Sequence, residues 1–184
     1  SPNAWAEFRL SSKSHWDVPV RLPGGEVLHL LASHPTPPGF DGVARRNNHR
    51  NHDEIQLWVD YLSGAPYIED DSGRAGGLHA DASFVVMGDL NADPDDPSSF
   101  RSAIRALVGH ERVNGAVVPT AGRQNGDSDL DPEDTSRWAA RIDYVLPSAN
   151  LTVQEARVWR PRPAQVPNVP VSDHFPVWID VRTG

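Results

Sequence analysis

The sequence has 184 residues, of which 38% are hydrophobic and 23% are charged. This length and composition predict a single folded domain, residues 1–184, and exclude a disordered segment. The formal net charge of −8 provides no basic field to neutralise many backbone phosphates, so extended binding to duplex nucleic acid is not expected. The sequence contains no cysteine, which excludes disulfides, and no apolar run approaches the ~20 residues of a membrane-spanning helix.

Hydrophobic periodicity predicts two strands and a helix in the first third of the chain. Alternating residues predict a strand at Ser14–Arg21, followed by a turn at Pro23–Gly25. Val27–Ala32 is apolar apart from His29, which is typical of a strand buried on both faces. Apolar residues at helical spacing predict a helix at Asp53–Leu62, and the Gly- and Asp-rich segment Ser63–Ala82 is expected to be a loop without a regular element.

The rest of the chain predicts one helix and four strands. The helix is expected to be capped by Ser98 and to extend to Leu107. The predicted strands are Phe84–Met87, Arg141–Leu146, Leu151–Trp159 and Val177–Val181, and loops are predicted at Arg123–Glu133 and Arg160–Pro170. Together these elements predict a mixed α/β fold, in which functional sites form at strand ends.

Polar groups follow two of the predicted buried strands. Ser33-His34-Pro35 comes after the first, and Gly88-Asp89-Leu90-Asn91 comes after the second. A histidine at a strand end is commonly a structural hydrogen-bonding residue, and Asp and Asn are common turn formers. Each pattern taken alone therefore has a structural explanation as well as a functional one.

Two further patterns place carboxylates beside later strands. Asp143 interrupts an apolar strand, and burying an unpaired carboxylate costs several kcal/mol, so it needs a partner. Arg141 or a histidine from another loop could serve. Ser172-Asp173-His174 directly precedes the last strand and brings two acid/base or ligand groups to one point, although a turn would also explain it.

In this order, the four patterns resemble the last four signature motifs of the endonuclease/exonuclease/phosphatase superfamily, the DNase I-like metal-dependent phosphoesterases. The motifs are a strand-end Ser-His, Gly-Asp-Phe-Asn with Leu90 in place of Phe, Arg-Ile-Asp-Tyr and Ser-Asp-His-x-Pro, and the resemblance extends from about Trp16 to Val181. The segments S-H-P-T-P-P-G-F-D-G and R-N-H-D-E-I are similar to an exported bacterial subgroup. The resemblance therefore implies an extracellular or periplasmic location in bacteria.

The resemblance implies an α/β fold that is part of a four-layer α/β sandwich, with mixed, mostly antiparallel sheets flanked by helices. It also assigns roles to the hydrolytic residues. Asp89 would orient or deprotonate the attacking water, and Asn91 would hold a phosphoryl oxygen. His174 would contact the phosphate and be oriented by Asp143. His34 would stabilise the transition state or protonate the leaving group.

The resemblance further implies that Asp173, together with Asp89, contributes to a divalent-cation site. Mg²⁺ is expected there because it binds through one or two carboxylates plus water and substrate phosphate, and Mn²⁺ or Ca²⁺ could replace it. Members of the superfamily also carry an Asn motif and a metal-binding Glu motif in their first half, and no segment here matches either. We therefore expect the chain to be the C-terminal portion of such a domain, with the N-terminal portion absent. The isolated chain is then expected to be inactive and to self-associate through an exposed apolar surface.

Other readings of the sequence remain open. Small phosphorylated substrates, including sugar or inositol phosphates, are favoured by the acidic charge. A nuclease acting on short or single-stranded nucleic acid is an alternative, because substrate choice depends on loops and not on the fold. A second alternative is a non-catalytic binding module that keeps the fold. A third alternative is a metal-stabilised structural domain, with Ca²⁺ in the acidic segment Asp127–Asp134.

Overall fold

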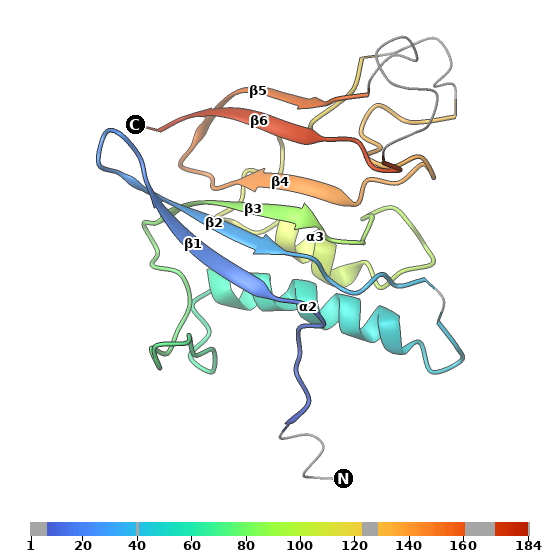
Figure 1. Cartoon of the computed structure of the whole chain (residues 1–184), viewed down its shortest axis with the longest axis horizontal. Coiled ribbons are helices and arrows are strands. Elements are labelled where there is room, and N and C mark those ends of the chain that lie inside the picture. Colours follow the sequence, from blue (N-terminus) through green and yellow to red (C-terminus); the bar gives the residue numbers. More distant parts are fainter. Residues whose placement is uncertain (1–6, 40, 123–128, 161–171, 184) are drawn as a thin grey trace.

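A computed structural model of the protein describes residues 7–39, 41–122, 129–160 and 172–183. Its elements, in chain order, are β1 (His15–Arg21), β2 (Val27–Ser33), α2 (Arg46–Leu62), β3 (Ser83–Asp89), α3 (Ser102–Val108), β4 (Asp143–Pro147), β5 (Thr152–Val158) and β6 (Val177–Arg182) (Figure 1). This is the predicted order of strands and helices. Much of the two predicted loops, residues 123–128 and 161–170, lies outside the described residues.

Four strands form one sheet in the order β1-β2-β3-β4, and β5 and β6 form a separate antiparallel pair. β2 and β3 are parallel, whereas the β1–β2 and β3–β4 pairs are antiparallel. Figure 1 shows α2 and α3 on one side of the four-stranded sheet, with β5 and β6 beyond β4 on the other side. The predicted mixed, mostly antiparallel α/β class is confirmed.

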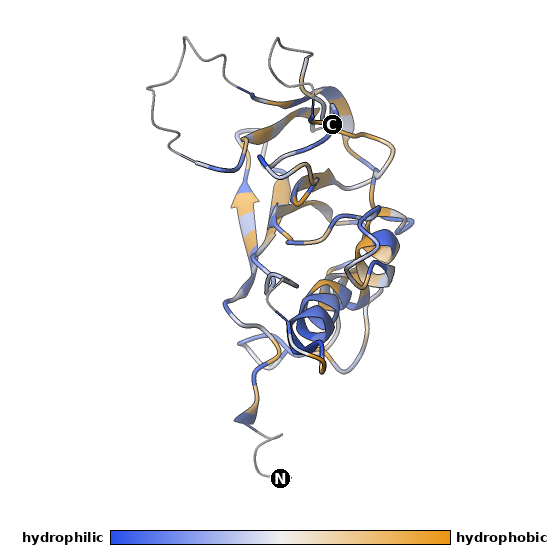
Figure 2. Ribbon diagram, turned by 90° about the vertical axis from the view of Figure 1, so that its right-hand side faces the viewer, coloured by the Kyte–Doolittle hydropathy of each residue, from blue (hydrophilic) through white to orange (hydrophobic). Residues whose placement is uncertain are grey.

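The main core lies between this sheet and the two helices. Apolar side chains of the sheet and of the two helices are fully or almost fully buried there. They include Leu31, Phe84, Val86 and Leu146 from the sheet, Ile55, Trp58 and Leu62 from α2, and Ile104 and Leu107 from α3. Figure 2 shows the matching pattern, with strands that are largely hydrophobic and an α2 that is hydrophilic over much of its surface. Burial of this apolar area is the main force that holds the helices on the sheet.

The opposite face of the sheet is also apolar but is only partly covered. Strand pairing aligns two rows of side chains across it, Trp16, Ala32, Met87 and Val145 in one row and Val18, Leu30, Val85 and Pro147 in the other. Trp16 is 61% exposed and Val18 is 42% exposed. The prediction that the Val27–Ala32 strand is buried on both faces is therefore wrong for its outward face, where Leu28 and Leu30 are half-buried.

Helix α2 begins at Arg46, seven residues before the predicted Asp53. Residues Arg46 to His52 are all polar, so they carry no apolar helical period. The carboxylate of Asp41 accepts hydrogen bonds from the backbone N–H groups of Asn47 and Asn48, both at 2.8 Å. A side-chain acceptor for these first-turn donors stabilises a helix start, and only the folded loop brings it into position.

Two other predictions differ in detail, and a third is confirmed. Ser98 does not cap α3, because its backbone N–H and hydroxyl both donate to Asp96 in a turn and the helix begins four residues later, at Ser102. Asp143 begins β4 and does not interrupt a strand. The predicted loop Ser63–Ala82 has no helix or strand, apart from an isolated bridge between Glu69 and Ala75.

Candidate active site

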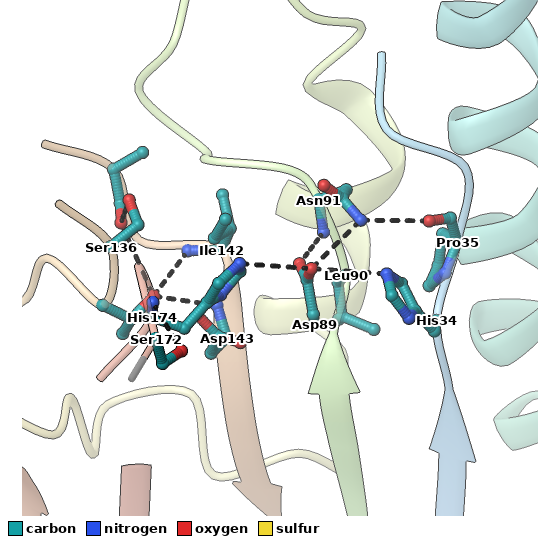
Figure 3. Close-up of polar contacts among 12 residues, drawn as sticks. His34, Pro35, Asp89, Leu90, Asn91, Ser136, Ile142, Asp143, Ser172 and His174 are labelled. Carbon is teal, nitrogen blue, oxygen red and sulfur yellow. Dashed lines mark hydrogen bonds and ion pairs between the residues drawn. The ribbon is translucent and has the colours of Figure 1, made fainter. Parts of the chain in front are cut away.

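The sheet topology brings three predicted site residues to one edge. β2 and β3 are parallel, so His34, just after β2, and Asp89, the last residue of β3, lie at the same end of the sheet. β4 runs antiparallel to β3, and its first residue, Asp143, pairs directly with Asp89. His174 reaches the same point from the segment before β6 (Figure 3).

Gly88 allows β3 to approach β2 closely at this edge. It adopts φ +138°, a backbone region that side-chain-bearing residues avoid. A Cβ at this position would lie 2.0 Å from the carbonyl oxygen of Ser33. Any other residue would push the strands apart, so Gly88 helps to set the separation of His34 and Asp89.

The carboxylate of Asp89 lies between two imidazoles. Its Oδ2 atom is 3.4 Å from Nε2 of His34 and 4.0 Å from Nε2 of His174. Burial raises the pKa of Asp89 and the nearby charge of Asp143 adds to this, although the N–H of Asn91 and the two histidines oppose it. A raised pKa makes Asp89 a stronger base than an ordinary aspartate.

Asp143 finds its partner in His174. The imidazole Nδ1 is 2.9 Å from Oδ2 of Asp143, so the histidine from another loop, one of the two predicted options, is confirmed. Burial alone would lower the pKa of His174, but the hydrogen bond and charge of Asp143, with the charges of Asp89 and Asp173, raise it overall. Arg141 instead places its guanidinium over the Tyr144 ring, 4.8 Å from the centroid.

Asn91 holds Asp89 in place. Its backbone N–H donates to Oδ1 of Asp89 at 2.9 Å, in a turn where Asn91 adopts φ +50°. Its side-chain amide donates to Oδ2 of Asp89 at 3.2 Å and to the carbonyl oxygen of Pro35 at 3.1 Å. In this arrangement the amide orients Asp89, and a phosphoryl oxygen would have to replace one of these two acceptors.

Two buried residues of α2 bind chain segments next to the site, and sequence reasoning missed both. The Asn51 amide donates to the carbonyl oxygens of Thr36 at 2.9 Å, Leu90 at 3.0 Å and Asn91 at 3.3 Å. The fully buried carboxylate of Glu54 accepts from the N–H groups of Ser12 and Thr36.

A signal for Asn51 was present in the sequence. Positions 51, 55, 58 and 62 follow helical spacing, so Asn51 continues the apolar face formed by Ile55, Trp58 and Leu62. A polar residue on that face has to find a hydrogen-bond partner when it is buried. The spacing could have placed Asn51 on the inner face, but it could not have identified the three carbonyls that Asn51 contacts.

Asp89, Asp143 and His174 form a group that could hold a cation. Among the described residues, these three place one ligand atom each within 4.8 Å of one another. The charge of Asp143 raises the pKa of Asp89, and a cation would relieve this repulsion between carboxylates. A donor set with two carboxylates also suits Mg²⁺.

Asp173 lies outside this group. It is exposed, and its backbone carbonyl accepts a hydrogen bond from the N–H of Arg137 at 2.9 Å. The role predicted for its carboxylate as a metal ligand stays a prediction. The suggested Ca²⁺ segment Asp127–Asp134 is described only from residue 129 onward, and the described part provides no comparable group of ligand atoms.

The site opens into a hollow of about 730 Å³. The polar part of its lining includes His34, Asp89, Asp143 and His174. The apolar part comes from the uncovered sheet face and from the chain around β6, and includes Trp16, Ala32, Met87, Val145, Phe175 and Val177. The candidate site is therefore accessible.

The chain is a mixed α/β protein of DNase I-like architecture, as its sheet arrangement and the carboxylates and histidines at the strand ends indicate. A profile of the Endonuclease/Exonuclease/phosphatase family matches residues 11–174, so the chain belongs to this family. Members of the family are metal-dependent hydrolases that act on phosphate esters. The predicted family is confirmed.

Solved structures show the same fold at low identity. An endonuclease/exonuclease/phosphatase from Beutenbergia cavernae DSM 12333 is 21% identical with a TM-score of 0.55, and the match covers 91% of this chain and 39% of that one. Sphingomyelinase C from Streptomyces griseocarneus is 19% identical with a TM-score of 0.53, covering 94% and 59%. A family protein from Leptotrichia buccalis C-1013-b is 16% identical with a TM-score of 0.52, covering 91% and 52%.

The chain spans 39% to 59% of the length of these three proteins. No curated protein matches the sequence. None of the helices among the described residues is both long and apolar enough to cross a membrane.

Proposed function

We propose that the protein hydrolyses a phosphate ester with the help of a divalent cation, and that the cation is Mg²⁺. The observation that carries this proposal is the position of Asp89, which lies 3.4 Å from His34 and 4.0 Å from a His174 that is itself paired with Asp143. Hydrolysis of a phosphate ester needs a base for water, charge neutralisation at the phosphoryl oxygens and a proton for the leaving group. His34, Asp89, Asp143 and His174, here called the catalytic cluster, supply a group suited to each of these three needs.

The geometry supports a distinct task for each side chain. Asp89 is the base that orients or deprotonates water, because its pKa is raised and Asn91 holds its carboxylate in place. His174 contacts the phosphoryl group as a cation, since Asp143 favours its protonated form. His34, with half of its side chain exposed, is positioned to protonate the leaving group.

The cation would be held by the carboxylates of Asp89 and Asp143, and Asp173 is proposed as an additional ligand. When bound, it would supply positive charge for the phosphoryl oxygens. No segment matches the family's Asn and Glu motifs, so we propose that the 184-residue chain by itself has little or no turnover.

The acidic charge supports a small phosphorylated substrate over an extended nucleic acid. A net charge of −8 repels a polyanion, and a compact phosphate ester brings only one phosphate to the site.

The test is hydrolysis of 4-nitrophenyl phosphate and bis(4-nitrophenyl) phosphate, by the 184-residue chain and by the protein expressed from its full reading frame. We expect the full protein to release nitrophenol with Mg²⁺, to lose activity with EDTA and to recover it when Mg²⁺ is restored. His174→Ala should abolish release, whereas Trp178→Ala, on the exposed side of β6, should not. Hydrolysis that persists in His174→Ala would show that the activity arises elsewhere.

A further inference from the structure

Trp138 lies against the candidate catalytic histidine. The ring centroids of Trp138 and His174 are 5.2 Å apart and the ring planes meet at 89°, an edge-to-face contact. Trp138 is nevertheless 53% exposed. A large aromatic side chain gains stability by burial, so core packing does not explain why half of this one stays in water.

A short loop presents Trp138 in a fixed position. The loop is closed at its base, where the N–H of Thr135 and the hydroxyl of Ser136 donate to the carbonyl of Ala140 at 3.0 Å and 3.1 Å. It is joined to the His174 segment by the N–H of Arg137, which donates to the carbonyl of Asp173 at 2.9 Å. These bonds fix the base of the loop to the chain that carries the histidine.

The residue after Trp138 is strained. Ala139 adopts φ +55°, which is unfavourable for a residue with a Cβ. Such strain persists only where the surrounding structure imposes it, and it is common at ligand-binding positions. An exposed aromatic ring on a strained but well-anchored loop, beside the histidine, is the arrangement expected of a ligand contact.

Trp138 also lines a second hollow, of about 680 Å³. Two chain segments connect residues that line this hollow to the residues around Asp89 and Asp143. Asp93 lies two residues after Asn91, Arg141 lies two residues before Asp143, and the N–H of Arg141 donates to Asp93 at 2.8 Å. Trp138 therefore stands between the catalytic cluster and the second hollow.

We propose that Trp138 determines specificity by receiving the non-reacting part of the substrate, and that this part is a neutral hydroxylated ring such as a sugar or cyclitol. The inference rests on the proposed function, because it assumes that the phosphate is bound at His174. The C–H groups on one face of such a puckered ring can pack against the flat face of the indole. The ring would then extend into the second hollow.

The charge of this hollow disfavours an anionic group. The hollow is lined by carboxylates, including Asp93, Asp95 and Asp96. Carboxylates accept hydrogen bonds from hydroxyl groups and repel a second phosphate. A chain of nucleotides, which would place another phosphate there, is therefore a poor ligand for this hollow.

The test compares two esters in the full protein. One is myo-inositol 1-phosphate, which has the ring, and the other is methyl phosphate, which lacks it. Because the indole removes apolar surface of the cyclitol ring from water, Trp138→Ala should lower the ratio of kcat/KM for the inositol ester to that for methyl phosphate by about tenfold. Trp138→Phe should restore most of the ratio, because it keeps a flat ring. Trp178→Ala removes another exposed tryptophan and should leave the ratio unchanged.

Two outcomes would overturn the proposal. An equal loss for both esters in Trp138→Ala would mean that the indole acts only through His174. Phosphocholine is measured alongside. If Trp138→Ala lowered kcat/KM for phosphocholine alone, the indole would receive a cation and not a neutral ring. Circular dichroism and thermal unfolding of the variants establish that each is folded.

A binding measurement separates this proposal from the proposed function. Saturation-transfer NMR with myo-inositol, without metal, should show binding to the wild type and to Trp138→Phe, and little binding to Trp138→Ala. If no ester is hydrolysed but this pattern holds, the proposed function fails and the ring site stands. If the wild type shows no binding at millimolar inositol, the ring site is overturned even where hydrolysis is observed.

Discussion

Asp143 acts on the chemistry through His174, and its charge can be removed without changing its shape. In Asp143→Asn the amide can still contact Nδ1 of His174, at 2.9 Å in the wild type, but it no longer favours the protonated imidazole. We expect turnover in the full protein to fall by roughly 10³-fold or more, as for other hydrolases in which an aspartate orients the histidine. NMR titration in EDTA should show the pKa of His174 falling, and thermal unfolding should be nearly unchanged.

Near-wild-type hydrolysis by Asp143→Asn would remove Asp143 from the mechanism. An unfolded variant would instead show that the Asp143–His174 pair serves stability. Asp180→Asn, an exposed aspartate on β6, is the control for replacing a carboxylate with an amide.

His15 should make the protein less stable in mild acid. Burial lowers its pKa, although the carbonyl and charge of Glu54 oppose this, and its ring contacts Trp58 with centroids 5.0 Å apart. Because the folded pKa lies below the unfolded value of about 6.5, the unfolded chain binds the extra proton first. The contribution of His15 is therefore complete above about pH 6.5 and is lost as the pH falls below that value toward the folded pKa.

The measurement is the free energy of unfolding in urea between pH 5 and pH 8, for the wild type and for His15→Asn. The variant should lose less stability on acidification than the wild type. His174 has the opposite sign, because its pKa is raised, but it is present in both proteins and cancels in the difference. If the free energy of unfolding changed with pH by the same amount in both proteins, the assignment to His15 would be contradicted.

At the scale of elements, α2 holds the site together through polar contacts. Asn51 joins the loop after β2 to the loop after β3, so Asn51→Ala would leave the carbonyls of Thr36, Leu90 and Asn91 without this donor. We expect a loss of about 1–3 kcal/mol in the free energy of unfolding, the cost of buried groups left unsatisfied. Hydrogen exchange at Thr36 and Asn91 should also become faster.

Asn47→Ala is the matched control for this change. Its amide donates to the carbonyl of Gly39 at 3.2 Å in a solvent-exposed hydrogen bond, so the loss should be within ~0.5 kcal/mol. If the two variants lost equal stability and showed equal exchange, Asn51 would not be the link between the loops.

The sequence predicted most of these elements because their signals are local. Alternation and apolar runs located β1, β2 and β3 to within two residues, and the Asp-His and Gly-Asp-x-Asn patterns located the site at the strand ends. The start of α2 could not be predicted, because it depends on Asp41 folding back onto Asn47 and Asn48. The same applies to Trp138, whose contact with His174 joins segments that are 36 residues apart in the printed sequence.

At the scale of the whole molecule, the two faces of the four-stranded sheet have unequal cover. Helices α2 and α3 bury one face, whereas the other carries the apolar rows that begin at Trp16 and Val18. β5 and β6 cover this second face only on the β4 side, where β6 contacts β4. Exposed apolar patches beyond a few hundred Å² commonly mark sites of association.

We therefore predict that the 184-residue chain self-associates through this face. Burying apolar surface yields about 25 cal/mol per Å², so pairing two such faces would offset the entropy lost on association. Light scattering and sedimentation should show the mean mass rising with concentration above the 20.2 kDa of one chain. Trp16→Glu places a charge at the most exposed apolar position of the face and should weaken association at least tenfold. Trp178→Glu adds the same charge on β6 and should not. A wild-type chain that stays monomeric at millimolar concentration would contradict the prediction, and equal effects of the two variants would place the interface elsewhere.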